Sequence, residues 1–509
     1  MKKYILCLGV ALSGAALTSC ESFLDVNTDP NNPITSSPNF LLPGIISQGI
    51  QQQMFTSLTT AYITQYAVRK TPASSTDQFV LTNGNSTNTF NYAYFYSAGN
   101  VPTMIEAAEK AKAPYYIGAG KIITAMDLAH ATDMLGDIPY SEAFKGAENY
   151  TPKYDPQEQI YATVQTLLDE GIALMRTPAA ENLLPLYISS PSISGDILYR
   201  GDTDKWIRFA NALKARQLNH LSKKAAYNPQ QILQLVSASF RNAADDAQLQ
   251  YQVAVAPLSG TTNIYGVTRA NFGAATFSNN IVRYLNGSVT GAAFPGVTDP
   301  RLPIMLAGSS NGADPGVGIP ATSNLINNVA DFYNGWYARD LGIFEVITFH
   351  ELKFIEAEAA FKAGEKGRAL TAYKAGIRAH MTKIGVGGTF ANPNVTFPTI
   401  TPAQIDAYLA SAAVAQTEAE LTLKHIMEQK YIAMFLNPES WSDLRRYDFD
   451  PAIYPNLKYP VGAPNGLGGQ WPRRMLPGAT EVMYNPQAVA ALGASAPDYI
   501  TKPLWWDMP

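Results

Sequence analysis

The sequence predicts a mainly α-helical protein with a large irregular part that contains loops and short strands. Three observations support this fold class. Apolar residues recur every three to four positions through several long stretches, which is the period of an amphipathic helix. Other stretches lose that period and are rich in Gly, Pro, Asn and Thr. Apolar residues make up 46% of the 509 residues, which is enough for a full hydrophobic core.

The chain begins with the pattern of an export signal. Two lysines precede an uncharged apolar run that ends at Leu17, and Thr18 and Ser19 then stand before Cys20. The run is shorter than the roughly 20 apolar residues that a membrane-spanning helix needs. A cysteine at the cleavage point predicts a lipoprotein, in which residues 1–19 are removed and palmitate-type acyl chains on Cys20 anchor the protein. A plain signal peptide with a chance cysteine is the alternative.

The net charge bears on the possible partners, and the cysteine count bears on disulfides. The formal net charge is −4 and the sequence shows no basic cluster, which argues against nucleic acid as a partner. Cys7 lies in the segment expected to be removed, so the mature chain would keep a single thiol and no internal disulfide. We therefore expect a lipid-anchored, otherwise soluble protein.

Residues 20–38 are rich in Asn, Asp and Pro and predict an extended, lipidated tether. Acidic and amide residues alternate from Asp25, as at the start of a calcium loop. However, Pro30 stands at the position of the required glycine and Ser36 at that of the required glutamate, so the EF-hand interpretation is rejected.

The remaining residues, 39–509, are expected to form one domain, whose helical scaffold is built mainly from residues 39–70, 102–240, 346–385 and 403–446. Pro114 suits the first turn of a helix that should stop at Gly136. Asp155 is predicted to cap the next helix, with Glu158 at its third position.

Two adjacent helices are predicted at about 348–363 and 366–384, broken by Gly364. An antiparallel pair of this size resembles a tetratricopeptide hairpin. Further along, Thr417 and Glu420 have the spacing of a capping box, which predicts the start of a last long helix.

The loop-rich part is expected mainly at residues 71–101, 251–345 and 447–509. Loops carried on a rigid scaffold are where binding groups concentrate. Aromatic rings there could stack on the apolar face of a sugar while amides bond its hydroxyl groups, and a peptide could use the same rings. If residues 71–100 are extended, alternate side chains point to opposite sides, so some of their rings belong to the core. The candidate ligand-binding residues are Phe79, Tyr92, Tyr94, Tyr96, Asn271, Tyr333 and Trp336.

No catalytic residue or metal ligand can be assigned from motifs. The G-x-S-x-G match at 308–312 is followed by Pro315 instead of a helix, and the histidine of His350-Glu351 lacks its partner because Phe354 stands there. Gly120-Lys121 lacks the hydroxyl residue of a phosphate loop. The sequence leaves open a pair of carboxylates for glycoside hydrolysis, and a structural calcium ion, whose oxygen ligands need no fixed spacing. No cofactor is expected.

Several motifs in order along the chain resemble those of the SusD/RagB family of surface lipoproteins. They are Cys20 with Phe23-Leu24-Asp25 and Asn27-Thr28-Asp29-Pro30-Asn31, Gly136 to Ala143, Trp206 to Lys214, Glu356-Ala357-Glu358-Ala359, Glu439 to Arg446, and Trp471-Pro472-Arg473-Arg474 with Tyr484-Asn485. The tether looks most like the SusD-like branch that differs from the starch-binding founder.

The resemblance implies a bundle of tetratricopeptide-like helix pairs that carries a loop-rich half. It implies a lipid anchor in the outer membrane, display at the cell surface, and a SusC-like TonB-dependent barrel as partner. The protein would capture an oligosaccharide or oligopeptide and close over the barrel as a lid, without catalysis. Ligand contacts in the family follow no fixed motif, so none is transferred. Asp443, Arg445 and Arg446 are interpreted as structural ion-pairing residues. A surface hydrolase and a scaffold or adhesion lipoprotein are the alternatives.

Overall fold

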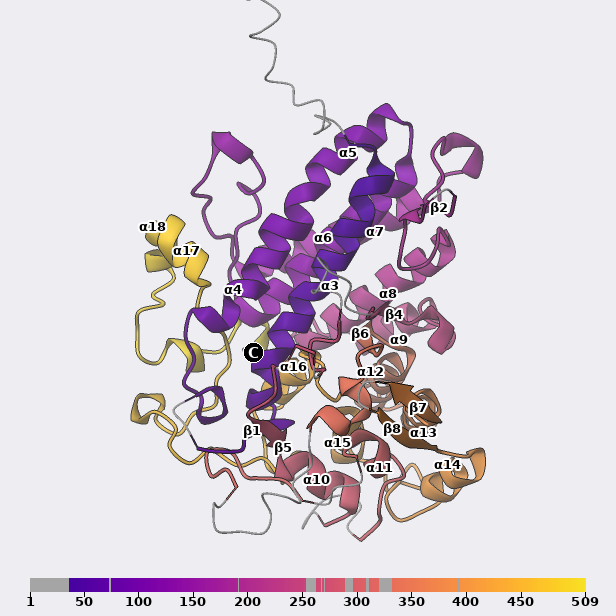
Figure 1. Cartoon of the computed structure of the whole chain (residues 1–509), viewed down its shortest axis with the longest axis vertical. Coiled ribbons are helices and arrows are strands. Elements are labelled where there is room, and N and C mark those ends of the chain that lie inside the picture. Colours follow the sequence, from indigo (N-terminus) through magenta and orange to yellow (C-terminus); the bar gives the residue numbers. More distant parts are fainter. Residues whose placement is uncertain are drawn as a thin grey trace, which may run out of the picture.

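The computed structural model confirms a mainly helical protein with few, short strands (Figure 1). It describes residues 36–72, 75–190, 192–252, 262–266, 268–269, 271–288, 296–307, 311–319, 332–391 and 394–509. The expected signal peptide, Cys20 and nearly all of the predicted tether lie outside these residues. Among the helices so described, none combines the length and the hydropathy needed to cross a bilayer.

A row of packed helices forms the scaffold. Successive members contact one another in the order α6–α7–α8–α9–α12–α13–α14, and α3 and α5 pack on α6. Helices α3, α5, α6 and α7 lie side by side in the upper part of Figure 1. Their bounds are α3 Pro38–Ile63, α5 Val101–Lys110, α6 Pro114–Leu135, α7 Gln157–Met175, α8 Thr203–His220, α9 Pro229–Ser237, α12 Phe349–Lys362, α13 Lys366–Ile384 and α14 Pro402–Leu409.

Within the described ranges, the rest of the molecule consists of shorter helices and four two-stranded antiparallel sheets. The helices are α4 Gly84–Asn91, α10 Asn279–Asn286, α11 Leu302–Met305, α15 Leu423–Ala433, α16 Glu439–Arg446, α17 Ala479–Tyr484 and α18 Pro486–Ala491. The sheets pair β1 Ala67–Arg69 with β5 Ala275–Phe277, β2 Tyr187–Ile188 with β3 Ser194–Gly195, β4 Ala247–Gln250 with β6 Ile343–Ile347, and β7 Val386–Ala391 with β8 Asn394–Thr399.

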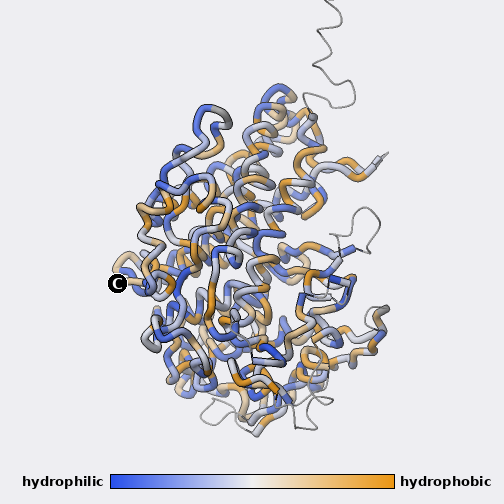
Figure 2. The backbone as a smooth tube through the Cα atoms, turned by 60° about the vertical axis from the view of Figure 1, so that its left-hand side comes forward, coloured by the Kyte–Doolittle hydropathy of each residue, from blue (hydrophilic) through white to orange (hydrophobic). Residues whose placement is uncertain are grey.

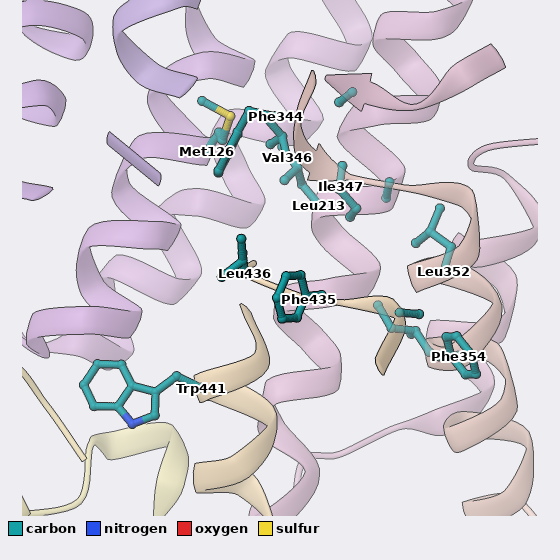
Figure 3. Packing of buried hydrophobic residues seen from close by; sticks show 14 of the residues in the cluster. Met126, Leu213, Phe344, Val346, Ile347, Leu352, Phe354, Phe435, Leu436 and Trp441 are labelled. Atoms are coloured by element: carbon teal, nitrogen blue, oxygen red, sulfur yellow. The ribbon is translucent and has the colours of Figure 1, made fainter. Parts of the chain in front are cut away.

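One large hydrophobic cluster runs through both parts. Figure 3 shows part of this cluster, which includes Trp441 of α16, Phe435 and Leu436, residues of β6, and residues of the scaffold helices. Hydrophobic and hydrophilic residues alternate at short intervals along the helical parts of the chain (Figure 2). This is the pattern of helices that bury one face.

The predicted helix bounds hold best where a proline or glycine sets them. Helix α6 begins at Pro114, and its C-terminal residue is followed by Gly136 at φ +93°, a conformation that favours glycine. Helices α12 and α13 meet at Gly364, as predicted. The first helix is shorter than predicted: it ends at Ile63, Gln65 adopts φ +59°, and the chain then enters β1.

Three local predictions are wrong. Residues 84–97, predicted as loop, form α4 followed by a π-helical turn over Tyr92–Ser97. Asp155 does not cap α7; instead Asp137 Oδ1 accepts the N–H of Gln157, 2.9 Å away. Thr417 and Glu420 exchange capping-box hydrogen bonds of 3.3 Å around one turn, but α15 begins later, after a second cap at Thr422.

Candidate functional site

A partly exposed group of three aromatic rings and one arginine joins three segments that are distant in sequence. We call Phe55, Tyr92, Tyr96 and Arg269 the aromatic platform. The rings of Phe55 and Tyr92 stack with centroids 4.9 Å apart, and Tyr96 meets Tyr92 edge-on at 5.3 Å. The guanidinium carbon of Arg269 lies 5.6 Å from the centroid of Phe55. Tyr96 is 50% exposed, so the platform opens to solvent.

The platform follows from local helical geometry. Side chains four residues apart in a helix share one face, so the helical conformation of residues 84–97 brings Tyr92 and Tyr96 together. Phe90 and Tyr94 have the same spacing and fall on another face, where their rings stack at 4.2 Å. The extended conformation assumed from the sequence would not have produced this separation.

The segment that carries Arg269 is fixed against α3. Tyr265 stacks on Phe272 at 5.7 Å, and its hydroxyl lies 2.6 Å from Oγ of Ser57. The amide of Asn271 donates to the carbonyl of Ile264 at 2.7 Å, which closes the loop. Asn271 is exposed, so its predicted role as a ligand contact stays a prediction.

The platform offers a ligand aromatic rings, two phenol groups and a guanidinium group. The rings can stack on an apolar ligand face, and the polar groups can donate hydrogen bonds at its edge. Partial burial raises the pKa of Tyr92, with Arg269 opposing that shift, so the phenol stays protonated at neutral pH and keeps its donor.

The structure corrects three of the predicted ligand contacts. Phe79, Tyr94 and Trp336 are only 1%, 7% and 6% exposed, and their rings belong to the hydrophobic core. Phe79 packs on Trp471 at 5.2 Å, and Tyr94 stacks on Phe144 at 5.6 Å.

Trp336 is covered by the guanidinium of Arg339, whose central carbon lies 3.1 Å from the ring centroid, and by Phe390 and Phe397 of the β7–β8 hairpin. Tyr333 is half-buried against the same core. Of the seven predicted residues, only Tyr92 and Tyr96 come together on the surface as a pair.

Sequence reasoning missed Phe55 and Arg269. Phe55 lies off the apolar stripe that predicted α3, and an aromatic residue at such a position is a usable signal for a surface role. Arg269 carried no signal, because its neighbourhood depends on how Tyr265 and Phe272 pack on α3.

The family motifs have structural roles. Glu358 of α12 accepts hydrogen bonds from Arg446 of α16 at 2.5 and 2.9 Å, and Asp443 accepts from Arg446 at 2.5 Å. Arg445 was expected to pair with an acid. Instead it donates to the carbonyls of Asp133 and Arg473 and stacks on the ring of Trp441 at 4.1 Å.

Asp133, His220 and Glu439 form a buried cluster whose ligand atoms lie within 4.8 Å of one another. Asp133 Oδ2 is 3.2 Å from Nδ1 of His220, and Glu439 Oε1 is 2.5 Å from Nε2. Burial alone would lower the pKa of His220, but the two carboxylates outweigh it and raise the pKa to about 9. With the imidazole charged, each ring nitrogen can donate a hydrogen bond to one of the two carboxylates. The cluster fits a structural imidazolium.

The histidine of the rejected His350-Glu351 motif is also structural. His350 is buried, and burial lowers its pKa to about 4. Its neighbour Glu351 is occupied by a bidentate interaction with Arg216, at 2.7 and 2.6 Å.

Comparisons with known proteins place the fold. The chain matches, over residues 30–476, the model of a SusD-like family described as starch-binding and associating with the outer membrane. No curated protein matches it.

Similar solved structures include two SusD homologues from Bacteroides fragilis. One is 23% identical, with a TM-score of 0.67 over 93% of this chain and 100% of that one. The other is 19% identical, with a TM-score of 0.70 over 93% and 100% of the two chains. A chitin-binding SusD homologue from Flavobacterium johnsoniae is 21% identical, with a TM-score of 0.64 over 92% and 98%. At these identities the likeness shows a shared fold.

The family model covers most of the chain. The chain therefore belongs to the SusD-like family of proteins that associate with the outer membrane.

Proposed function

We propose that this protein binds an oligosaccharide at the aromatic platform and delivers it, as a lid, to a SusC-like TonB-dependent barrel. Acyl chains on Cys20 would anchor it at the cell surface. The observation that carries the proposal is the cluster of exposed Tyr96 with half-buried Tyr92 and Phe55 on the scaffold of a glycan-binding family. Members of that family are binding proteins, and the platform offers stacking surfaces without a nucleophile.

An oligosaccharide fits the platform better than an oligopeptide. The open ring surface of Tyr96 suits the apolar face of a sugar ring, and phenol and guanidinium groups suit its hydroxyls. A structural neighbour is a chitin-binding protein, which supports a glycan of that class as the first ligand to test. An oligopeptide remains the second candidate, because it can use the same rings.

Binding is tested by calorimetry with chitohexaose, maltohexaose and a mixed hexapeptide library. The wild-type protein should bind one of the two glycans, and Tyr92→Ala and Tyr96→Ala should each weaken binding by about tenfold, the loss expected for one stacked ring. Phe40→Ala is the matched control, since Phe40 is an exposed aromatic residue near the start of α3, away from the platform. Binding that survives both tyrosine substitutions would refute the platform as the site.

Delivery is tested in the native outer membrane. Gentle detergent extraction of the wild-type protein should recover a large barrel in fixed ratio, and Cys20→Ala should release the protein from the membrane fraction. Recovery of the protein without a barrel would contradict the lid role. Release of shortened glycans by the purified protein would instead favour the hydrolase alternative.

A further inference from the structure

A hollow lies on the helical scaffold, and no residue of the aromatic platform lines it. It has a volume of about 380 Å³ and lies between α5, α6 and the loop that carries Tyr140 and Phe144. We propose that this hollow is a second sugar-binding site, which takes one neutral pyranose ring of the same glycan. The inference rests on the proposed function for its ligand class. Its volume is within the range of small-molecule sites, about 300–1,000 Å³.

The loop that forms one wall is held rigidly. The carboxylate of Asp155 accepts hydrogen bonds from the backbone N–H groups of Tyr140 and Ser141, at 2.9 and 2.7 Å, and from the hydroxyl of Ser141 at 2.6 Å. The hydroxyl of Tyr94 donates to the carbonyl of Pro139 at 2.6 Å. A wall fixed in this way loses little conformational entropy when a ligand binds.

Phe144 is held in a strained conformation. Its φ is +63°, a left-handed value that is an outlier for a bulky residue. Its ring stacks on Tyr94 at an interplanar angle of 18° and meets Tyr140 edge-on at 6.3 Å. The ring is half-exposed, so core burial alone does not explain why the strain is kept. Strain of this kind concentrates at binding sites.

The lining combines the groups that a sugar ring requires. Ile105 and Leu167 supply aliphatic surface beside the two aromatic rings. Glu106 and Glu109 supply carboxylate acceptors for sugar hydroxyls at the rim, where each is exposed. Thr124 also lines the hollow.

The hydroxyl of Thr124 is buried and has no hydrogen-bond partner within the part of the chain that the structure describes. An unpaired buried hydroxyl is costly, and a ligand hydroxyl would satisfy it. A purely apolar ligand would leave this group and the rim carboxylates unused.

The two sites can be separated by mutation because no residue of the aromatic platform lines the hollow. Saturation-transfer NMR with N-acetylglucosamine and methyl glucoside would be measured on wild type, on Tyr92→Ala/Tyr96→Ala, and on that variant combined with Phe144→Gly. Glycine tolerates the positive φ, so this substitution removes the ring without adding backbone strain. Thr124→Val removes the hydroxyl alone, and Phe40→Ala is the control.

We expect sugar signals to persist in the double tyrosine variant, to fall to background when Phe144→Gly is added, and to weaken several-fold with Thr124→Val. Signals that disappear in the double tyrosine variant would overturn the second site and leave the platform intact. Signals that persist in the double variant and disappear with Phe144→Gly would support the hollow, whatever the platform binds. Wild-type protein without any sugar signal would refute both sites. Circular dichroism melting curves confirm that each variant is folded.

Discussion

The Nε2 atom of His220 lies 2.5 Å from Oε1 of Glu439, where the end of α8 meets the start of α16. Both residues are buried, and the pair links two segments that carry family motifs. The carboxylate holds the imidazole in its charged form. Burial alone would raise the pKa of Glu439, but the imidazolium and the nearby cations Arg216 and Lys430 outweigh it and lower the pKa to about 2. The pair therefore makes the stability of the fold depend on pH in both directions.

The contribution of the His220–Glu439 pair to the free energy of unfolding should be highest between about pH 4.5 and 6.5. The pKa of His220 is raised from 6.5 to about 9, so its contribution is complete below 6.5 and is lost as the pH rises through 9. The pKa of Glu439 is lowered from 4.5, so its contribution is present above 4.5 and is lost as the pH falls towards 2. The shift of the His220 pKa from 6.5 to about 9 corresponds to roughly 3 kcal/mol of unfolding free energy.

Urea unfolding of wild type and His220→Gln at pH 5.5 and pH 9 measures the effect on the alkaline side. The difference between the two proteins should be largest at pH 5.5 and shrink at pH 9. An equal difference at both pH values would contradict a charged His220.

Replacing Glu358 by Gln should lower the free energy of unfolding by roughly 3 kcal/mol, because it leaves the guanidinium of Arg446 with less charge compensation in the core. Glu358 accepts from both terminal nitrogens of Arg446 and from the hydroxyl of Tyr447, at 2.6 Å. Lys110→Ala breaks an exposed ion pair with Glu106 and should produce no measurable change in denaturant unfolding. Equal changes in unfolding free energy for Glu358→Gln and Lys110→Ala would contradict a stabilising role of the buried Glu358–Arg446 pair.

Two glycines inside helices should respond oppositely to alanine. A Cβ on Gly376 of α13 would lie 2.9 Å from the ring of Phe354 of α12, so Gly376→Ala should destabilise the helix pair by about 1–3 kcal/mol. Gly44 of α3 has nothing within 4 Å of such a Cβ, so Gly44→Ala should gain up to about 1 kcal/mol from helix propensity. Thermal unfolding of both variants tests the close approach of α12 and α13, and a stabilised Gly376→Ala protein would refute it.

Trp506→Ala should cost about 3–5 kcal/mol, because the ring is fully buried with Leu504 and Tyr161. The guanidinium carbon of Arg445 lies 4.9 Å from the ring centroid of Trp506, and this contact would also be lost. Trp505→Ala is the comparison, since that ring is only partly buried. Chemical denaturation of the two variants should show a much larger loss for Trp506, and equal losses would contradict the packing described.

The helical scaffold could be predicted from sequence because its signals are local. Pro114, Gly136 and Gly364 mark helix ends through backbone conformation alone, and the apolar period marks the buried faces. Residues 84–97 were missed because their Asn, Ser and Thr residues favour loops, and tertiary contacts with α3 override that preference. The four-residue spacing of Tyr92 and Tyr96 was the helical signal available there.

The candidate site was predictable only in part. The sequence indicates which residue types can bind a glycan, but burial decides which rings remain available. Phe79 is buried against Trp471, and Trp336 is buried against the β7–β8 hairpin. Both partners are remote in sequence. Arg269 joined the platform through a fold-back that has no local signature.

The packing of Trp505 and Trp506 on Tyr161 and His220 has a consequence for the order of folding. These contacts join residues that are several hundred positions apart. The chain must therefore lose the entropy of closing a long loop before the contacts form. The scaffold helices α7 and α8 therefore lack part of their native surroundings in every nascent fragment that stops short of Leu504. Native packing is reached only once the whole chain has been synthesised, which favours a folding route that finishes after translation.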